Sequence, residues 1–191
     1  MTDFEDRDIK IFSKKVAEDD PESLIRLAEE TTRQRNNGNV AKAVSLGEKI
    51  AEMVSDIDSI DDEDFKKLMN SDLIDDKILY QVRLLLTFAA ESTVHRTLMN
   101  VPLLSTTAVN AMYDRMMESD RPFYLDTTDA FTFYYVAFRK HDRIVERIGR
   151  RFAMLCGKQE DEEFERFGSG LYMILCRIID AEIEKSEFIL D

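Results

Sequence analysis

The side chains best suited to catalysis or metal binding are two histidines and two cysteines, namely His95, His141, Cys156 and Cys176. Glu91 lies four residues before His95, and on a helix this spacing places both side chains on one face, where they form either an ion pair or half of a metal site. A di-iron helical bundle needs Glu and His pairs on two helices plus two further glutamates, and no second Glu–His pair occurs here. We therefore favour the ion pair, and we predict that the protein uses no cofactor.

His141 and Cys156 are too far apart to form a catalytic pair. On one straight helix, the 15 residues between them correspond to about 22 Å. His141 also lies on an apolar helical stripe, which is typical of a core histidine bonded to a carbonyl group. The chain has neither of the glycine-rich motifs that bind phosphates, Gly-x-x-x-x-Gly-Lys-Ser/Thr and Gly-x-Gly-x-x-Gly. We therefore predict a protein that is not an enzyme.

The densest aromatic stretch spans residues 131–138 and contains Phe131, Phe133, Tyr134, Tyr135 and Phe138. Aromatic residues at helical spacing are usually core, but they also line pockets for apolar ligands. We favour core packing and expect Phe133, on the opposite side from Phe131 and Phe138, to need a partner surface. The alternative function is a helical bundle that binds a ligand or acts as a metal-dependent enzyme, using this cluster or Glu91 and His95.

A basic segment is the feature that core packing explains least. It combines arginines at every fourth position with two adjacent basic residues, and we call this set the arginine ridge: Arg139, Arg143, Arg147, Arg151, Lys140 and Arg150. On one helix the four spaced arginines lie opposite the apolar stripe that contains Phe138 and Phe152, so they face outward. A run of charges is usually a solvated face, and this reading stays open. The other reading, which we adopt as a prediction, is that the ridge binds a partner protein.

An acidic segment could be the complement of the arginine ridge. Residues 56–64 contain six carboxylates in nine positions. Arginine favours two-pronged contacts with carboxylates. The ridge could meet this segment within the fold, across a dimer, or meet an acidic segment on another protein.

The net charge of −13 opposes binding to nucleic acids and to anionic membranes, and we predict neither. The N-terminus is acidic and lacks the apolar run of a signal peptide, and no stretch approaches 18 consecutive apolar residues. Two cysteines without metal-binding or redox spacing are typical of reduced thiols. These features together predict a cytoplasmic protein.

Glycine and proline are scarce, with six and three residues in a chain where ordinary usage would give roughly 23 together. Hairpin and strand–helix turns need these residues, so their scarcity predicts an all-α fold. We expect a single domain over residues 1–191, an irregular bundle of six or seven helices. It would consist of an N-terminal αα-hairpin over residues 20–55, an acidic loop with a short helix over 56–76, and a helical core over 77–191.

The hairpin has clear start and turn signals. Asp19-Asp20-Pro21 can begin its first helix, and Arg35-Asn36-Asn37-Gly38-Asn39 is its loop. The fragments Pro21-Glu22-Ser23-Leu24, Leu27-Ala28, Ala43-Val44 and Glu48-Lys49 resemble the two-helix pattern of a tetratricopeptide repeat. Thr31 stands where that family usually has a tyrosine, and no second copy follows along the chain. Stacked repeats need several units to bury a core, so we favour a generic antiparallel hairpin.

The remaining elements are read from their apolar periodicity. A helix from Asp75 to about Met99 is apolar nearly all round and should be the central post of the bundle. Further helices are expected to begin near Ser105, to run from about residue 128 to Cys156, and to extend from the acidic residues 160–163 to about Ser186. The last helix has a heptad seam: Phe164, Phe167, Leu171, Ile174, Ile178 and Ala181. This seam and the apolar Phe188-Ile189-Leu190 predict a homodimer, although one seam can also be satisfied inside the bundle.

Overall fold

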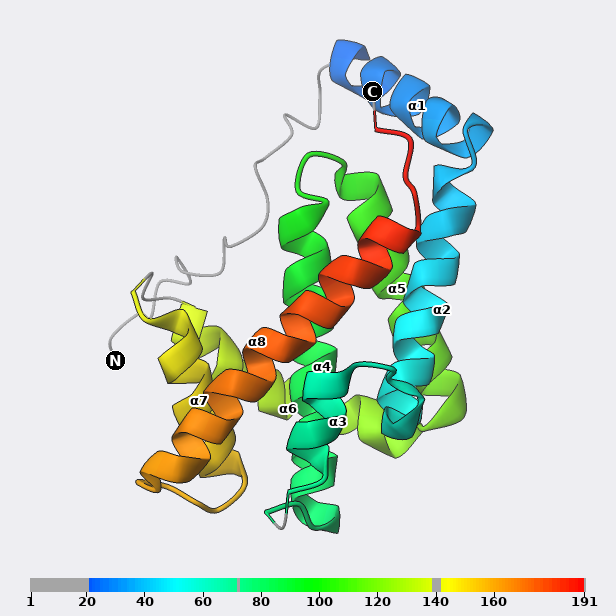
Figure 1. Ribbon diagram of the computed structural model, residues 1–191. Helices are drawn as coiled ribbons and strands as arrows, with labels where there is room; N and C mark the ends of the chain where they lie inside the picture. The colour runs from blue at the N-terminus through cyan, green and yellow to red at the C-terminus, as the bar shows by residue number, and fades with distance from the viewer. Residues whose placement is uncertain (1–20, 72, 139–141, 191) are drawn as a thin grey trace, which may run out of the picture.

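The computed structural model describes residues 21–71, 73–138 and 142–190. Within these ranges it contains eight α-helices and no strands, which confirms the all-helical prediction. The helices are α1 (Pro21–Asn36), α2 (Asn39–Ser55), α3 (Glu63–Met69), α4 (Asp76–Thr97), α5 (Pro102–Ser119), α6 (Arg121–Phe138), α7 (Ile144–Leu155) and α8 (Glu162–Lys185), with a short 3-10 turn at Ile57–Ser59. Figure 1 shows an irregular bundle in which α8 crosses in front of α4, with α2 and α7 on opposite sides.

Helix α4 is the central element, as its sequence predicts. Eleven of its residues are buried, including Leu85 and Phe88, and it packs against α8, α5 and α6. The carboxylate of Asp75 caps its first turn by accepting a hydrogen bond from the backbone N–H of Ile78 at 2.8 Å. Arg83 then ties α4 to its neighbours, because it donates to the carbonyl of Val54 at 2.8 Å and pairs with Asp120 at 3.0 Å.

Two pairs of helices approach closely at glycines. At Gly47 on α2, a Cβ would lie 2.1 Å from the carbonyl oxygen of Ala108 on α5. At Gly149 on α7, a Cβ would lie 2.2 Å from the Oγ of Ser169 on α8, and Gly168 lies against Phe152 on the same interface. Helix α8 runs unbroken through residues 168–170. These glycines therefore serve close packing and do not break the last helix.

The middle of the chain differs from its predicted boundaries. The segment expected to run from about residue 128 to Cys156 is two helices: α6 begins earlier, at Arg121, and ends at Phe138, and α7 begins at Ile144. Arg143 has φ 50° and ψ 42°, a left-handed conformation that cannot belong to a right-handed helix. Pro102 lies at the start of α5, which therefore begins before Ser105, because proline is tolerated in the first turn of a helix. Two separate helices in place of one raise the expected six or seven to eight.

The N-terminal pair has the predicted turn, with Gly38 at φ 81° between α1 and α2. Figure 1 shows α1 lying across the end of α2 rather than along it, at the end of the molecule where the C-terminal tail also arrives. The tail is held by Asn39, whose side chain accepts from the N–H of Ile189 at 3.0 Å and donates to its carbonyl at 2.8 Å. The same side chain donates to Gln34 of α1 at 2.5 Å. The tetratricopeptide-like arrangement is not confirmed.

The heptad seam of α8 is satisfied inside the chain. Phe164, Phe167, Leu171 and Ile178 are buried, while Ile174 and Ala181 are half-buried. The helix packs along α7 and α4, and Phe152 of α7 stacks on Phe164 with ring centroids 6.1 Å apart. Most of the seam is therefore occupied by helices of the same chain.

Candidate functional site

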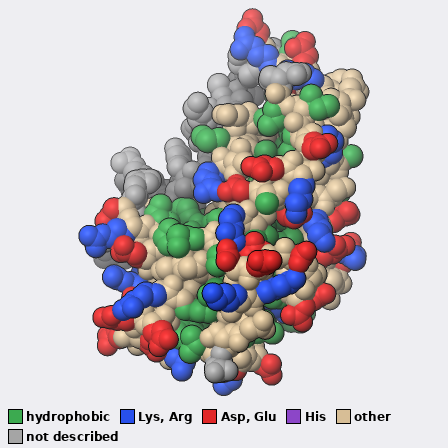
Figure 2. Space-filling view, viewed as in Figure 1, with side chains coloured by type: hydrophobic (Ala, Val, Ile, Leu, Met, Phe, Trp, Pro, Cys, Tyr) green, Lys and Arg blue, Asp and Glu red, His purple; other side chains and the backbone are tan. Residues whose placement is uncertain are grey.

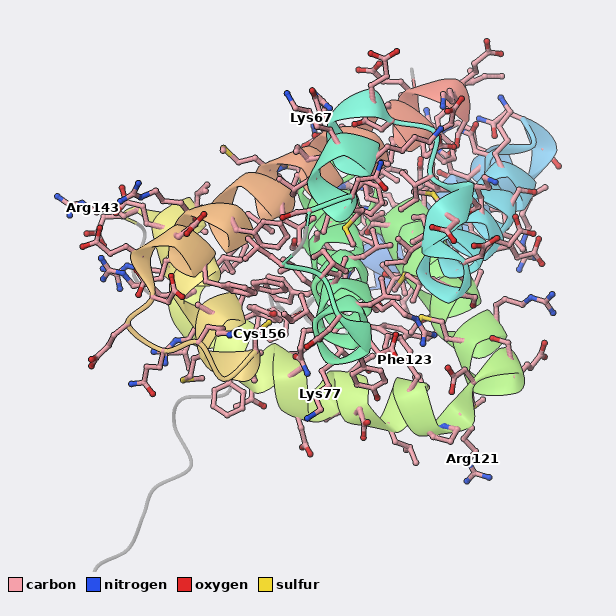
Figure 3. The ribbon with its side chains drawn as sticks, turned by 60° about the horizontal axis from the view of Figure 1, so that its bottom comes forward. Lys67, Lys77, Arg121, Phe123, Arg143 and Cys156 are labelled. Carbon is pink, nitrogen blue, oxygen red and sulfur yellow. The ribbon has the colours of Figure 1, made fainter. Side chains whose placement is uncertain are left out.

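The arginine ridge is only partly a helical face. Arg139 and Lys140 lie outside the described residues, as does His141. Arg143 precedes α7, so it does not share a helical face with Arg147 and Arg151. The prediction of four arginines on one continuous helix is therefore wrong, because the left-handed backbone at Arg143 interrupts the periodicity. Figure 3 shows the Arg143 side chain at the outer edge of the molecule, pointing away from the bundle.

The described arginines of the ridge differ in their surroundings. Arg147 pairs with Asp142 at 2.9 Å, and its side chain is only 28% exposed. Arg150 pairs with Glu165 of α8 at 3.2 Å. Arg151 donates to the sulfur of Met154 at 3.8 Å, whereas Arg143 is exposed and has no ion pair within the described part of the chain. Arg147 and Arg150 are therefore neutralised locally, whereas Arg143 and Arg151 have no ion pair among the described residues.

The acidic segment 56–64 is engaged by an arginine that the sequence analysis did not single out. Arg177 of α8 pairs with Asp62 at 2.9 Å and with Asp64 at 2.9 Å. Asp62 also caps α3 by accepting from the N–H of Phe65 at 2.9 Å. Within the described residues, the segment contacts α8 and not the ridge. A single arginine on a helix has no periodic signal, so only the packing of α3 against α8 identifies it.

Glu91 is held by tyrosines. Its carboxylate accepts hydrogen bonds from the hydroxyl of Tyr113 on α5 and from that of Tyr135 on α6, the second at 2.7 Å. Burial, with the negative charge of Glu91, raises the pKa of both tyrosines well above the usual value. In the described part of the chain, no three His, Cys, Asp or Glu side chains come together in a way that could hold a metal ion. Glu91 thus links three helices, and the tyrosines come from distant positions that no local motif connects to it.

The aromatic stretch 131–138 packs around Phe88 of α4. The ring centroid of Phe88 lies 5.4 Å from that of Phe131, 5.0 Å from that of Tyr134 and 5.5 Å from that of Phe138. Phe131 and Tyr134 are buried, and Phe133 is 40% exposed on the opposite side of α6. The hydroxyl of Tyr134 is fully buried and has no hydrogen-bond partner among the described residues.

Cys156 lies beside this aromatic core. The thiol is half-buried, and burial raises its pKa to about 12, so at neutral pH it is a protonated, weakly nucleophilic group. Figure 3 shows Cys156 inside the bundle, beside the helices that carry the aromatic rings.

Helix α1 exposes most of its apolar residues. Leu24, Ile25 and Leu27 are 54%, 57% and 57% exposed, and Ala28 is exposed as well. Its polar Gln34 is buried against Asn39, so the last turn, not the apolar row, anchors this helix. Figure 2 shows apolar side chains among charged ones at this end of the molecule. The apolar periodicity of α1 can be read from the sequence. That no other described element covers these apolar residues can be seen only in the fold.

None of the helices in the described ranges has the length and apolarity needed to cross a bilayer. No protein-family model matches this chain, and none of the curated proteins and none of the solved structures is similar enough to count as a match.

Proposed function

We propose that this chain is a non-enzymatic, cytosolic protein-interaction module, a scaffold or adaptor that offers helical surfaces to a partner. The observation that carries this proposal is the exposed apolar row of α1, formed by Leu24, Ile25, Leu27 and Ala28. Burying a large aliphatic side chain stabilises a complex by about 1.5–3 kcal/mol. Several such side chains on one exposed helix therefore favour binding of another apolar surface.

The arginine ridge is proposed as a second contact, suited to an acidic segment of a partner. Arg143 supports this role best, because it is exposed and lies at the periphery of the molecule. Arg150 has a largely exposed side chain, and its ion pair with Glu165 is weak enough at a surface to be exchanged for a partner's carboxylate. The chain's own segment 56–64 is already engaged through Arg177, so we propose that the acidic partner segment belongs to another protein.

The unpaired thiols support the cytosolic assignment. Cys156 and Cys176 are both free and half-buried on separate helical segments. Reducing compartments keep such thiols in this state.

One observation favours the alternative of a ligand-binding bundle: the buried hydroxyl of Tyr134 has no partner among the described residues. A buried hydroxyl without a partner is costly, and a ligand or a water that hydrogen-bonds to it would remove this cost. A ligand present at 100 times its Kd stabilises its protein by about 2.7 kcal/mol, which thermal unfolding detects easily. A shift of this size with a small apolar ligand in the wild type, lost in Tyr134→Phe, would favour the alternative.

Site-specific crosslinking in the cells from which the protein comes tests the main proposal. The photo-crosslinking residue p-benzoylphenylalanine replaces Ile25 in one variant and Leu125 of α6 in the matched control, since these side chains are 57% and 58% exposed. We expect discrete covalent products from position 25 and none from position 125. Equal products from both positions, or none from position 25, would refute the proposed function.

A further inference from the structure

We infer that the partner of α1 is a second copy of this chain, bound through an antiparallel pair of α1 helices about a two-fold axis near Ala28. This inference rests on the proposed function, since it assumes that the exposed row of α1 is a contact surface. Three observations carry it: the order of charges along one edge of α1, the small residues beside that edge, and the position of α1 in the fold.

The charged edge of α1 is self-complementary. Glu22, Arg26, Glu29 and Arg33 follow each other at spacings of four, three and four residues, so they lie along one side of the helix. All four are exposed. The edge therefore alternates acid, base, acid, base, and read backwards it alternates base, acid, base, acid.

A two-fold axis places the same surface of both copies face to face. In an antiparallel helix pair, the charged edge of one helix lies against the same edge of the other helix, and the two edges run in opposite directions. Glu22 of one copy then lies opposite Arg33 of the other, and Arg26 lies opposite Glu29. Every charge on the edge then faces an opposite charge, and the two-fold axis repeats each of these pairs. The two helix dipoles are antiparallel, which is also favourable.

The apolar row next to this edge can close the same interface. Ile25, Ala28 and Thr32 follow each other at spacings of three and four residues on the side of the helix next to the charged edge, and all three are exposed. Ala28 and Thr32 are small, so the two helix axes can approach closely at the centre. In this antiparallel register, Ile25 of each copy packs between Ala28 and Thr32 of the other.

The position of α1 relative to the other described helices is compatible with contact to a second copy. Figure 1 shows α1 at one end of the molecule, lying across α2 and beyond the main bundle. The C-terminal tail reaches the same end, and its Ile189 and Leu190 are about half exposed, so they can add apolar area. A 16-residue helix is about 24 Å long, which makes this a small interface with an expected Kd in the micromolar range.

Sedimentation velocity of the full chain tests the inference, at concentrations from about 1 μM to about 100 μM, a range that brackets this Kd. We expect a reversible shift from the 22.2 kDa monomer toward a species of twice that mass. Ile25→Glu should leave the protein monomeric throughout, with the same helical circular dichroism and melting temperature, because the side chain is already exposed. The matched control Leu125→Glu on α6 should dimerise like the wild type.

A charge exchange on the edge tests the antiparallel register. Arg26→Glu alone places two acidic residues opposite each other at two symmetric positions, and Glu29→Arg alone does the same with two basic residues. Each should weaken dimerisation by about tenfold or more. The double variant Arg26→Glu with Glu29→Arg restores opposite charges at both positions and should dimerise nearly as well as the wild type.

A protein that remains monomeric at every concentration would overturn this inference, as would a dimer that Ile25→Glu and both single charge reversals leave unchanged. A double variant as weak as the single ones would also contradict it. These results are distinct from a failure of the proposed function, because a monomer whose position 25 crosslinks to a different protein still has α1 as its interaction surface.

Discussion

Gly149 and Gly168 set the distance between α7 and α8. A Cβ at Gly168 would lie 2.8 Å from the ring carbon Cδ1 of Phe152 and 3.1 Å from the Cα of Gly149. The hydroxyl of Ser169 occupies the remaining space and donates to the carbonyl of Glu165 at 2.8 Å. Close backbone contact between these two helices thus depends on the missing side chains, whereas Gly170 on the next position of α8 has no atom within 4 Å of such a Cβ.

We expect Gly149→Ala and Gly170→Ala to change stability in opposite directions. The new methyl at position 149 would lie 2.2 Å from the Ser169 Oγ and 2.3 Å from the Glu165 carbonyl oxygen, so the helices must move apart. Such overpacking costs about 1–3 kcal/mol of unfolding free energy. Gly170→Ala meets no neighbour and removes a poor helix former, which should add about 1 kcal/mol. Urea unfolding followed by circular dichroism measures both changes, and equal losses in the two variants would contradict the packing argument.

At the scale of the element, α7 combines a buried apolar face with exposed basic residues. Its inner face, with Ile148 and Phe152, is fully buried against the bundle. Arg150 on this helix and Arg143 just before it are exposed, whereas Arg147 and Arg151 are half-buried at the flanks. Because Arg143 and Arg150 are exposed, the charge of these two arginines can be reversed without disturbing the core.

We expect the double reversal Arg143→Glu and Arg150→Glu to weaken binding of an acidic peptide by about tenfold or more, since each reversal replaces an attraction by a repulsion. A labelled peptide with the sequence of residues 56–64 is a suitable probe, with binding measured by fluorescence anisotropy. Wild-type binding should itself fall with added salt, because exposed charges are screened over about 8 Å at physiological ionic strength.

The matched control for this experiment is Arg115→Glu with Arg121→Glu, which changes the net charge equally. Both arginines are exposed, and Figure 3 shows Arg121 pointing outward on a different helix. If the control weakens binding as much as the α7 reversal, the peptide responds only to net charge and the arginine ridge is a solvated face.

At the scale of the whole molecule, a cysteine thiol and several tyrosine hydroxyls, all neutral at pH 7, lie between the packed helices. Burial raises the pKa of Cys156 to about 12, and burial with a hydrogen bond to Asp126 raises the pKa of Tyr80 to about 12. Burial is also the main cause of the raised pKa values of Tyr113, Tyr134, Tyr135 and Tyr172. In the unfolded chain the same thiols and phenols ionise at their ordinary values, near 9 and 10.

We therefore expect the protein to lose stability in alkali. Below about pH 9 these groups are protonated in both states, so they contribute no pH dependence. Between about pH 9 and pH 12 the unfolded chain releases protons that the folded chain retains, so the unfolding free energy falls as the pH rises, most steeply through the well-buried Tyr113 and Tyr134. The urea midpoint at pH 8, 10 and 11 measures this decline, and Cys156→Ala should make it shallower. A midpoint that stays constant up to pH 11 would contradict it.

The sequence by itself determined the helices and much of their character. Scarce glycine and proline, the Asp caps before α3, α4 and α8, and the all-round apolarity of α4 are local properties, because a helix is specified by its own periodicity and by its ends. The arginine ridge was identified in the same way, from spacing alone. Its prediction as one continuous face was wrong, because the left-handed backbone at Arg143 is not coded by any strong local signal.

The tertiary structure decided which faces are covered. Phe164 of α8 and Leu24 of α1 both lie on apolar helical rows, yet the first is buried against α7 and the second is exposed. The periodicity of a helix shows that one of its faces is apolar. Which element covers this face, if any does, depends on contacts between residues far apart in the chain. The same is true of Arg177 with Asp62 and of Glu91 with its tyrosines, whose side chains meet only after the helices have packed.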